Sequence, residues 1–211
     1  MARERSARPG WTTPNPMAYA KRERSPDPRE ESAGQRDSDE FEWMPYAALA
    51  GLVGAVIVAL FFLVVDLAAG RAAGWTPAFL GSMLFRDELI PANALPLRMP
   101  SIVIGYTALH GVTFFAFALF VGASRLAPRP PQPLAGGAAA ATALFIFVAC
   151  QALFISLGWL AGPGIALAER MGFGWVSGAN ACAALGMTGV IAWGARRLVA
   201  RAEVRLRNTN P

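Results

Sequence analysis

The stretch MPYAALAGLVGAVIVALFFLVVDLA, residues 44–68, carries one ionisable acid, Asp66, and no basic side chain. It is longer than the ~20 apolar residues that a helix needs to cross a hydrocarbon core of ~30 Å. Trp43 and Tyr46 stand at its beginning, where aromatic side chains anchor a span to the membrane surface. The stretch predicts a transmembrane helix, and the absence of a preceding apolar run predicts that it is also an uncleaved signal.

Three further stretches are apolar and long enough to span, at residues 101–123, 137–160 and 175–195. We therefore expect an all-α fold, a four-helix transmembrane bundle over residues 44–197. Residues 198–211 are rich in arginine and are predicted to form a basic cytoplasmic tail.

The segment 69–100 is too interrupted by proline, glycine and charge to cross the membrane. Thr76 followed by Pro77 is typical of a helix start, with threonine as the N-cap and proline at the first helical position. We predict a short amphipathic helix over residues 77–85, lying in the membrane interface with Trp75 as its anchor.

Residues 1–43 hold 17 of the 33 charged side chains, mixed with proline, serine and glycine. Such a segment buries too little apolar surface to offset its ordering entropy, so a disordered cytoplasmic arm is expected. The chain as a whole is 55% hydrophobic and 16% charged, against about 25% charged in soluble domains. Its net charge of +5 is explained by basic residues flanking the spans, so no nucleic acid partner is expected.

Arginines near the spans predict the orientation. Four spans place the N-terminus, the loop 124–136 and the C-terminus on one side. That side holds nine nearby arginines and the other side four. The nine are Arg29, Arg36, Arg125, Arg129, Arg196, Arg197, Arg201, Arg205 and Arg207. The positive-inside bias then places both termini in the cytoplasm.

Small residues recur along two of the spans. The first carries Ala47, Gly51, Ala55 and Ala59 at every fourth position, beside Ala50 and Gly54, and the last carries Gly174, Gly178, Cys182 and Gly186. Such stripes let another helix approach closely. They predict helix packing, either within the bundle or with a membrane-protein partner or second copy.

Five polar side chains are expected at similar depth in the outer half of the bundle. They are Asp66, Tyr106, His110, Gln151 and Asn180. If they face inward, they line a polar pocket, because polar groups in spans mark functional paths. The alternatives are that Gln151 and Asn180 fasten helices together and that Asp66 is an interfacial charge.

His110 lies near the midplane and has three interpretations. Its imidazole is satisfied by Tyr106 or Gln151, or relays protons or ions, or ligates haem or a chlorophyll-type pigment. A six-coordinate haem needs a second ligand from outside this chain, which has one histidine. Antenna helices typically place alanine four residues before the histidine, where Tyr106 stands here. The leading interpretation has no cofactor, and one histidine with two cysteines excludes structural zinc.

The sequence contains no nucleophile elbow, zinc-protease motif or phosphate-binding loop. We therefore predict a protein without catalytic activity, such as an accessory or structural subunit of a larger membrane complex. The alternatives are a small homo-oligomeric transporter or ion pathway through the polar residues, and haem or pigment binding at His110.

The motifs VVDLAAGR, TPAFLGSMLF and GYTALHGVTFFAF resemble those of a loose group of bacterial four-span membrane proteins without an assigned activity. The resemblance covers residues 44–197. It implies four spans and a bacterial plasma membrane location, and it brings no chemistry with it.

Overall fold

The computed structural model describes residues 41–86, 100–127, 132–160 and 172–209. Over these ranges the regular structure is helical: α2 (Met44–Ala68), α3 (Trp75–Arg86), α4 (Pro100–Leu126), α5 (Gly136–Leu160) and α7 (Phe173–Thr209). All but α3 are long and apolar enough to cross a membrane, which confirms the predicted all-α bundle with four spans. The predicted arm lies outside the described residues except for 41–43, which form the turn into α2.

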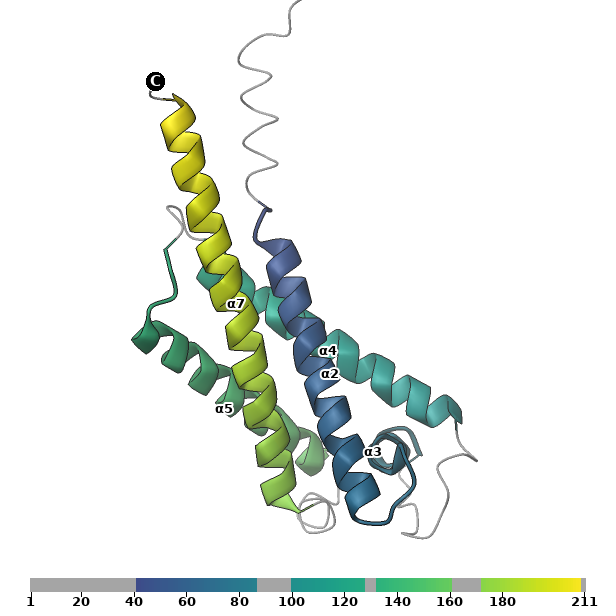
Figure 1. Cartoon of the computed structure of the whole chain (residues 1–211). Helices are drawn as coiled ribbons and strands as arrows, with labels where there is room; N and C mark the ends of the chain where they lie inside the picture. The colour runs from purple at the N-terminus through teal and green to yellow at the C-terminus, as the bar shows by residue number, and fades with distance from the viewer. Residues whose placement is uncertain (1–40, 87–99, 128–131, 161–171, 210–211) are drawn as a thin grey trace, which may run out of the picture. The chain divides into compact units, whose positions relative to one another are not determined.

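Helix α2 packs against both α4 and α7, and its direction is opposite to theirs (Figure 1). Gly51 makes the close approach to α4 possible. A Cβ atom there would lie 2.8 Å from the Cα of Phe115 and 2.9 Å from the carbonyl oxygen of Phe114. Since these are backbone atoms, the two helices touch main chain to main chain, as small residues permit in membranes.

Glycines of α7 receive large side chains of α2. A Cβ at Gly178 would meet the ring of Phe61, and one at Gly186 would meet Ile57. The stripes predicted from the sequence thus serve packing within this chain at these positions, and they are not free there for a partner. Gly174, which belongs to the same stripe, has open space around the position of a Cβ.

The opposite face of α2 presents its large apolar side chains outward. Its exposed residues include Leu52, Val56, Leu60, Val64 and Leu67. Large apolar side chains on the outer face are expected of a helix surrounded by lipid. Along α7, Trp175 and Trp193 are separated by about 27 Å at 1.5 Å per residue, close to the thickness of the hydrocarbon core.

Helix α7 is longer than predicted. The predicted span ends at residue 195, just before Arg196 and Arg197, but the helix continues to Thr209. Charge ends the apolar span without ending the helix, because arginine, alanine, leucine and glutamate are all good helix formers. Arg205 on this extension pairs with Glu42, which precedes α2. The segment predicted as a basic tail is therefore helical as far as it is described.

Helix α3 also differs from its prediction. It begins at Trp75 rather than Pro77, and it packs against α4. Phe79 is fully buried, and a Cβ at Gly81 would meet Ile102 of α4 at 2.6 Å. Figure 1 shows α3 end-on, beside the ends of α2 and α4, so it runs across the direction of α2.

We expect Gly51→Ala to destabilise the bundle by about 1–3 kcal/mol, since the methyl group must force two backbones apart. Gly111→Ala on α4 is the matched control. No atom lies within 4 Å of its Cβ position, so alanine is expected to be neutral or slightly stabilising there. Thermal unfolding in detergent measures both. Equal effects of the two substitutions would contradict the close α2–α4 contact.

Candidate functional site

The chain reverses direction between α2 and α3 through a glycine. Gly70 has φ +69°, which is costly for residues with a side chain. The N–H of Gly70 donates to the carbonyl of Leu67 at 3.0 Å, and the N–H of Arg71 donates to that of Asp66 at 2.8 Å. This is the Schellman pattern, which satisfies the last carbonyls of a helix. It brings the segment after α2 back over Asp66.

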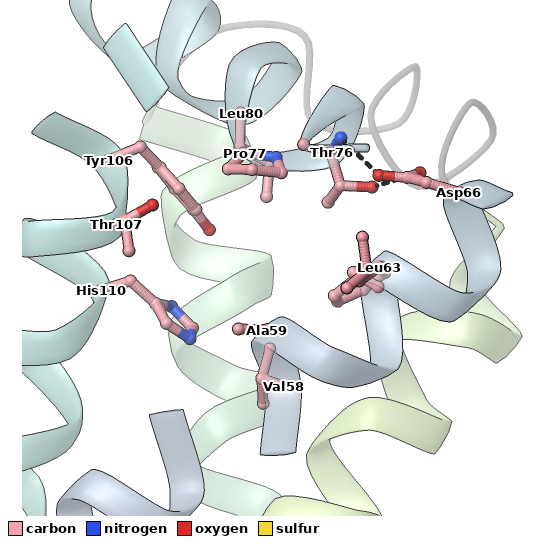
Figure 2. A pocket seen from close by; sticks show the side chains of 12 residues that line it. Val58, Ala59, Leu63, Asp66, Thr76, Pro77, Leu80, Tyr106, Thr107 and His110 are labelled. Carbon is pink, nitrogen blue, oxygen red and sulfur yellow. Dashed lines mark hydrogen bonds between the residues drawn. The ribbon is translucent and has the colours of Figure 1, made fainter. Parts of the chain in front are cut away.

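Asp66 holds the beginning of α3. Its carboxylate accepts a bond from the backbone N–H of Thr76 at 2.9 Å and one from the hydroxyl of Thr76 at 2.8 Å (Figure 2). The first turn of a helix has unpaired N–H groups and a partial positive charge, so a carboxylate is a suitable partner. Thr76 was predicted to be the N-cap, but α3 begins one residue earlier, at Trp75, and the Thr76 hydroxyl donates to Asp66.

Arg71 balances the charge of this carboxylate. Its Nε lies 3.5 Å from Oδ1 of Asp66, and its guanidinium lies 4.4 Å from the ring centre of Trp75. Trp75 in turn stacks on Phe79 at 4.9 Å. Asp66 is fully buried. A buried carboxylate is tolerated here because two hydrogen bonds and an opposite charge compensate it.

Two adjoining cavities lie beneath this contact. The first, of about 240 Å³, lies among α2, α3 and α4, and its lining includes Val58, Phe62, Asp66, Tyr106 and His110. The second, of about 230 Å³, extends toward α5 and α7. Both are lined mainly by apolar side chains. Because Tyr106 and His110 line both, these two residues stand where the cavities meet.

His110 has a buried nitrogen atom without a partner. Its Nε2 is inaccessible and makes no hydrogen bond. Figure 2 shows the imidazole directed from α4 toward Val58 and Ala59 of α2. Its ring stacks near Tyr106, with centroids 5.9 Å apart, and near Phe114 at 4.7 Å. Neither Tyr106 nor Gln151, the two partners suggested from the sequence for this imidazole, forms a hydrogen bond with Nε2.

Gln151 and Asn180 form a fastener between α5 and α7. The side-chain amide of Asn180 donates to Oε1 of Gln151, and the amide of Gln151 donates to the hydroxyl of Ser177 at 2.6 Å. In membranes such bonds contribute on average about 0.6 kcal/mol. Asn180 also lines the second cavity, whereas Gln151 is not among its lining residues.

The structure thus places four of the five expected polar residues around the two cavities and gives Gln151 a role beside them. Sequence reasoning missed Arg71, Thr76 and Ser177 as their partners. The sequence offered some indication for Thr76, because a Thr-Pro pair that begins a helix follows Asp66, near the end of a span, by ten residues. It offered none for Ser177, since the hydrogen bond of Ser177 depends on how α5 packs against α7.

The lipid-facing surface and the four spans define a multi-pass integral membrane protein. No family model, curated protein or solved structure matches the chain. The resemblance to bacterial four-span proteins therefore stays a prediction.

Loss of the Asp66 carboxylate is expected to cost more than loss of the Thr76 hydroxyl. Thr76→Val removes one hydrogen bond to a charged group, worth about 1.5–3 kcal/mol. Asp66→Ala leaves Thr76 and Arg71 without their partner and is expected to cost about 3–5 kcal/mol. Chemical denaturation in mixed micelles ranks the two variants. An Asp66→Ala protein as stable as Thr76→Val would show that the other contacts of this carboxylate contribute nothing.

Proposed function

We propose that this protein is a non-catalytic integral membrane protein that binds a small molecule within the bilayer, in the cavities at His110. The observation that carries the proposal is His110, which lines both apolar cavities and has a buried Nε2 without a hydrogen-bond partner. Apolar cavities with few convergent polar groups are the usual form of small-molecule sites. The proposal of a non-catalytic role rests on the sequence, which contains no recognised reaction motif.

Energetics support a ligand at His110. A buried polar group without a hydrogen bond costs about 1–3 kcal/mol, and a membrane interior supplies little water to relieve it. A ligand that donates to or accepts from Nε2 removes this cost. The free energy recovered in this way adds to the free energy of binding, and it favours ligands that carry a hydrogen-bonding group. Haem or pigment ligation through the same atom stays a prediction.

A second candidate role is that of an accessory subunit, which the sparse packing of α5 favours. Within the described chain, 11% of the apolar window of α5 is buried, against 44% for α7. Exposed residues such as Leu144, Val148 and Ile155 lie along it. Native mass spectrometry from mild detergent tests this role, which predicts a complex with another membrane protein. A lone monomer would contradict it.

We propose that the protein lies in a bacterial plasma membrane with both termini in the cytoplasm. The resemblance of its motifs to bacterial four-span proteins supports the location. The arginine distribution supports the orientation, as does the end of α7, where Arg197 lies 5.6 Å from the ring centre of Trp193. With this orientation Asp66, α3 and the cavities lie in the outer half of the membrane.

His110→Leu is expected to leave stability unchanged or to raise it, since it removes an unpaired polar group from an apolar site. Gln151→Leu is the comparison, because it breaks the hydrogen bonds with Ser177 and Asn180. It is expected to lose about 1 kcal/mol. Thermal unfolding in detergent without added lipid measures both. A His110→Leu protein destabilised as much as Gln151→Leu would make the imidazole structural and overturn the proposal.

The orientation predicts the behaviour of fusions. Green fluorescent protein after Pro211 is expected to fluoresce, because it folds in the cytoplasm, and alkaline phosphatase at the same point is expected to be inactive. Phosphatase inserted between residues 87 and 99 is the control and is expected to be active. The reverse pattern would contradict the proposed orientation and would place the cavities in the cytoplasmic half of the membrane.

A further inference from the structure

We infer that the molecule bound at His110 is a neutral lipid: one long hydrocarbon chain with a hydroxyl or carbonyl group that meets the imidazole. This inference rests on the proposed function and names the class of its ligand. It depends on the shape of the cavities, on the charges around them and on the side of the bundle to which they open.

The cavities form an elongated run along α4. A third cavity, of about 130 Å³, lies between α4 and α5. It shares Thr113, Phe114, Cys150 and Leu153 with the second cavity. From Tyr106 to Phe117 the run follows α4 for about 17 Å at 1.5 Å per residue. A chain fits such a run, whereas a compact ligand would leave most of it unfilled.

The charges around the run exclude an anionic headgroup. Among the described residues, Asp66 is the one charged side chain in the lining of these three cavities, and its oxygens already face Thr76 and Arg71. Within the same part of the chain, no arginine or lysine lines them to pair with a phosphate. Burying an unpaired charge costs far more than burying a hydroxyl or carbonyl that is hydrogen-bonded. The ligand is therefore uncharged.

The imidazole selects a hydroxyl or a carbonyl. A neutral histidine has one nitrogen that donates and one that accepts. A hydroxyl satisfies Nε2 in either tautomer, and a carbonyl satisfies it when Nε2 carries the proton. A hydrocarbon satisfies neither. The same cavity therefore binds a lipid with a hydroxyl or carbonyl group more tightly than a hydrocarbon of equal length.

The run opens toward lipid between α4 and α5. Three leucines of its lining are exposed on these two helices: Leu109 (44%), Leu153 (44%) and Leu157 (43%). The two helices meet at Phe117 and Phe145, whose ring centroids are 6.1 Å apart. Farther toward the α3 end, the second cavity separates them. A molecule dissolved in the bilayer reaches His110 from this side without passing through water.

The test uses the full chain in detergent and three probes of equal chain length: hexadecanol, hexadecane and hexadecyl phosphate. Binding is followed by native mass spectrometry and by the shift in unfolding temperature. Hexadecanol is expected to bind at least about tenfold more tightly than the other two, since it alone pairs with Nε2 without carrying charge. In His110→Leu its binding is expected to fall to that of hexadecane.

A pair of tryptophan variants tests the route. Leu153→Trp fills the opening between α4 and α5 and is expected to abolish hexadecanol binding. Leu144→Trp is its control, because Leu144 is exposed on α5 and lines none of the three cavities. It is expected to bind as the unmodified protein does. Equal binding by both variants would overturn the proposed opening.

The remaining outcomes separate the two proposals. Equal binding of hexadecanol and hexadecane to the unmodified protein would overturn the assignment of the ligand class, because lipid chains would then merely fill space. Preference for hexadecyl phosphate would overturn it as well. Either result leaves the proposed function standing, and the stability of His110→Leu then tests it. Undiminished binding of hexadecanol to His110→Leu would overturn the proposed function itself.

Discussion

The structure depends on how closely α4 and α7 approach α2. In lipid there is little hydrophobic force between helices, so van der Waals contact between backbones must hold them. Gly51 supplies this contact toward α4, and the glycines of α7 accept Phe61 and Ile57 in return. Each close contact uses a residue with little or no side chain on one of the two helices. On the face of α2 that is turned away from these contacts, large apolar residues such as Leu52, Val56 and Leu60 are exposed to lipid.

The second organising contact is ionic. Asp66 stands at the end of α2, and its carboxylate reaches the first turn of α3. Together with the turn at Gly70, it fixes the start of α3 beside the end of α2. Because α3 also packs tightly on α4 at Gly81, it forms one wall of the first cavity. The cavity therefore exists because a short helix is held across the end of the bundle.

Hydropathy and length were sufficient to predict the four spans, since each apolar stretch can be recognised without knowing which helices it packs against. Counting residues along the helices gave an estimate of the depth of Asp66, Tyr106, His110, Gln151 and Asn180. It could not predict the hydrogen-bond partners of these side chains. Whether His110 meets Gln151 or an empty cavity depends on the relative rotation of α4 and α5, and one sequence does not encode that in any local pattern. The length of α7 was missed because charge marks the edge of lipid, while helix formation depends on residue type and continues beyond it.

The extension of α7 has a mechanical consequence. Its residues from Trp193 to Thr209 project about 24 Å past the aromatic ring that marks the membrane edge, in continuous helical hydrogen bonding with the span. The same helix carries Asn180 at the wall of the second cavity and, near its other end, Arg205, which pairs with Glu42. A tilt of about 10° within the bilayer would displace its far end by about 4 Å, given the helical rise of 1.5 Å per residue. Any change in how α7 leans against its neighbours is thereby magnified on the opposite side of the membrane.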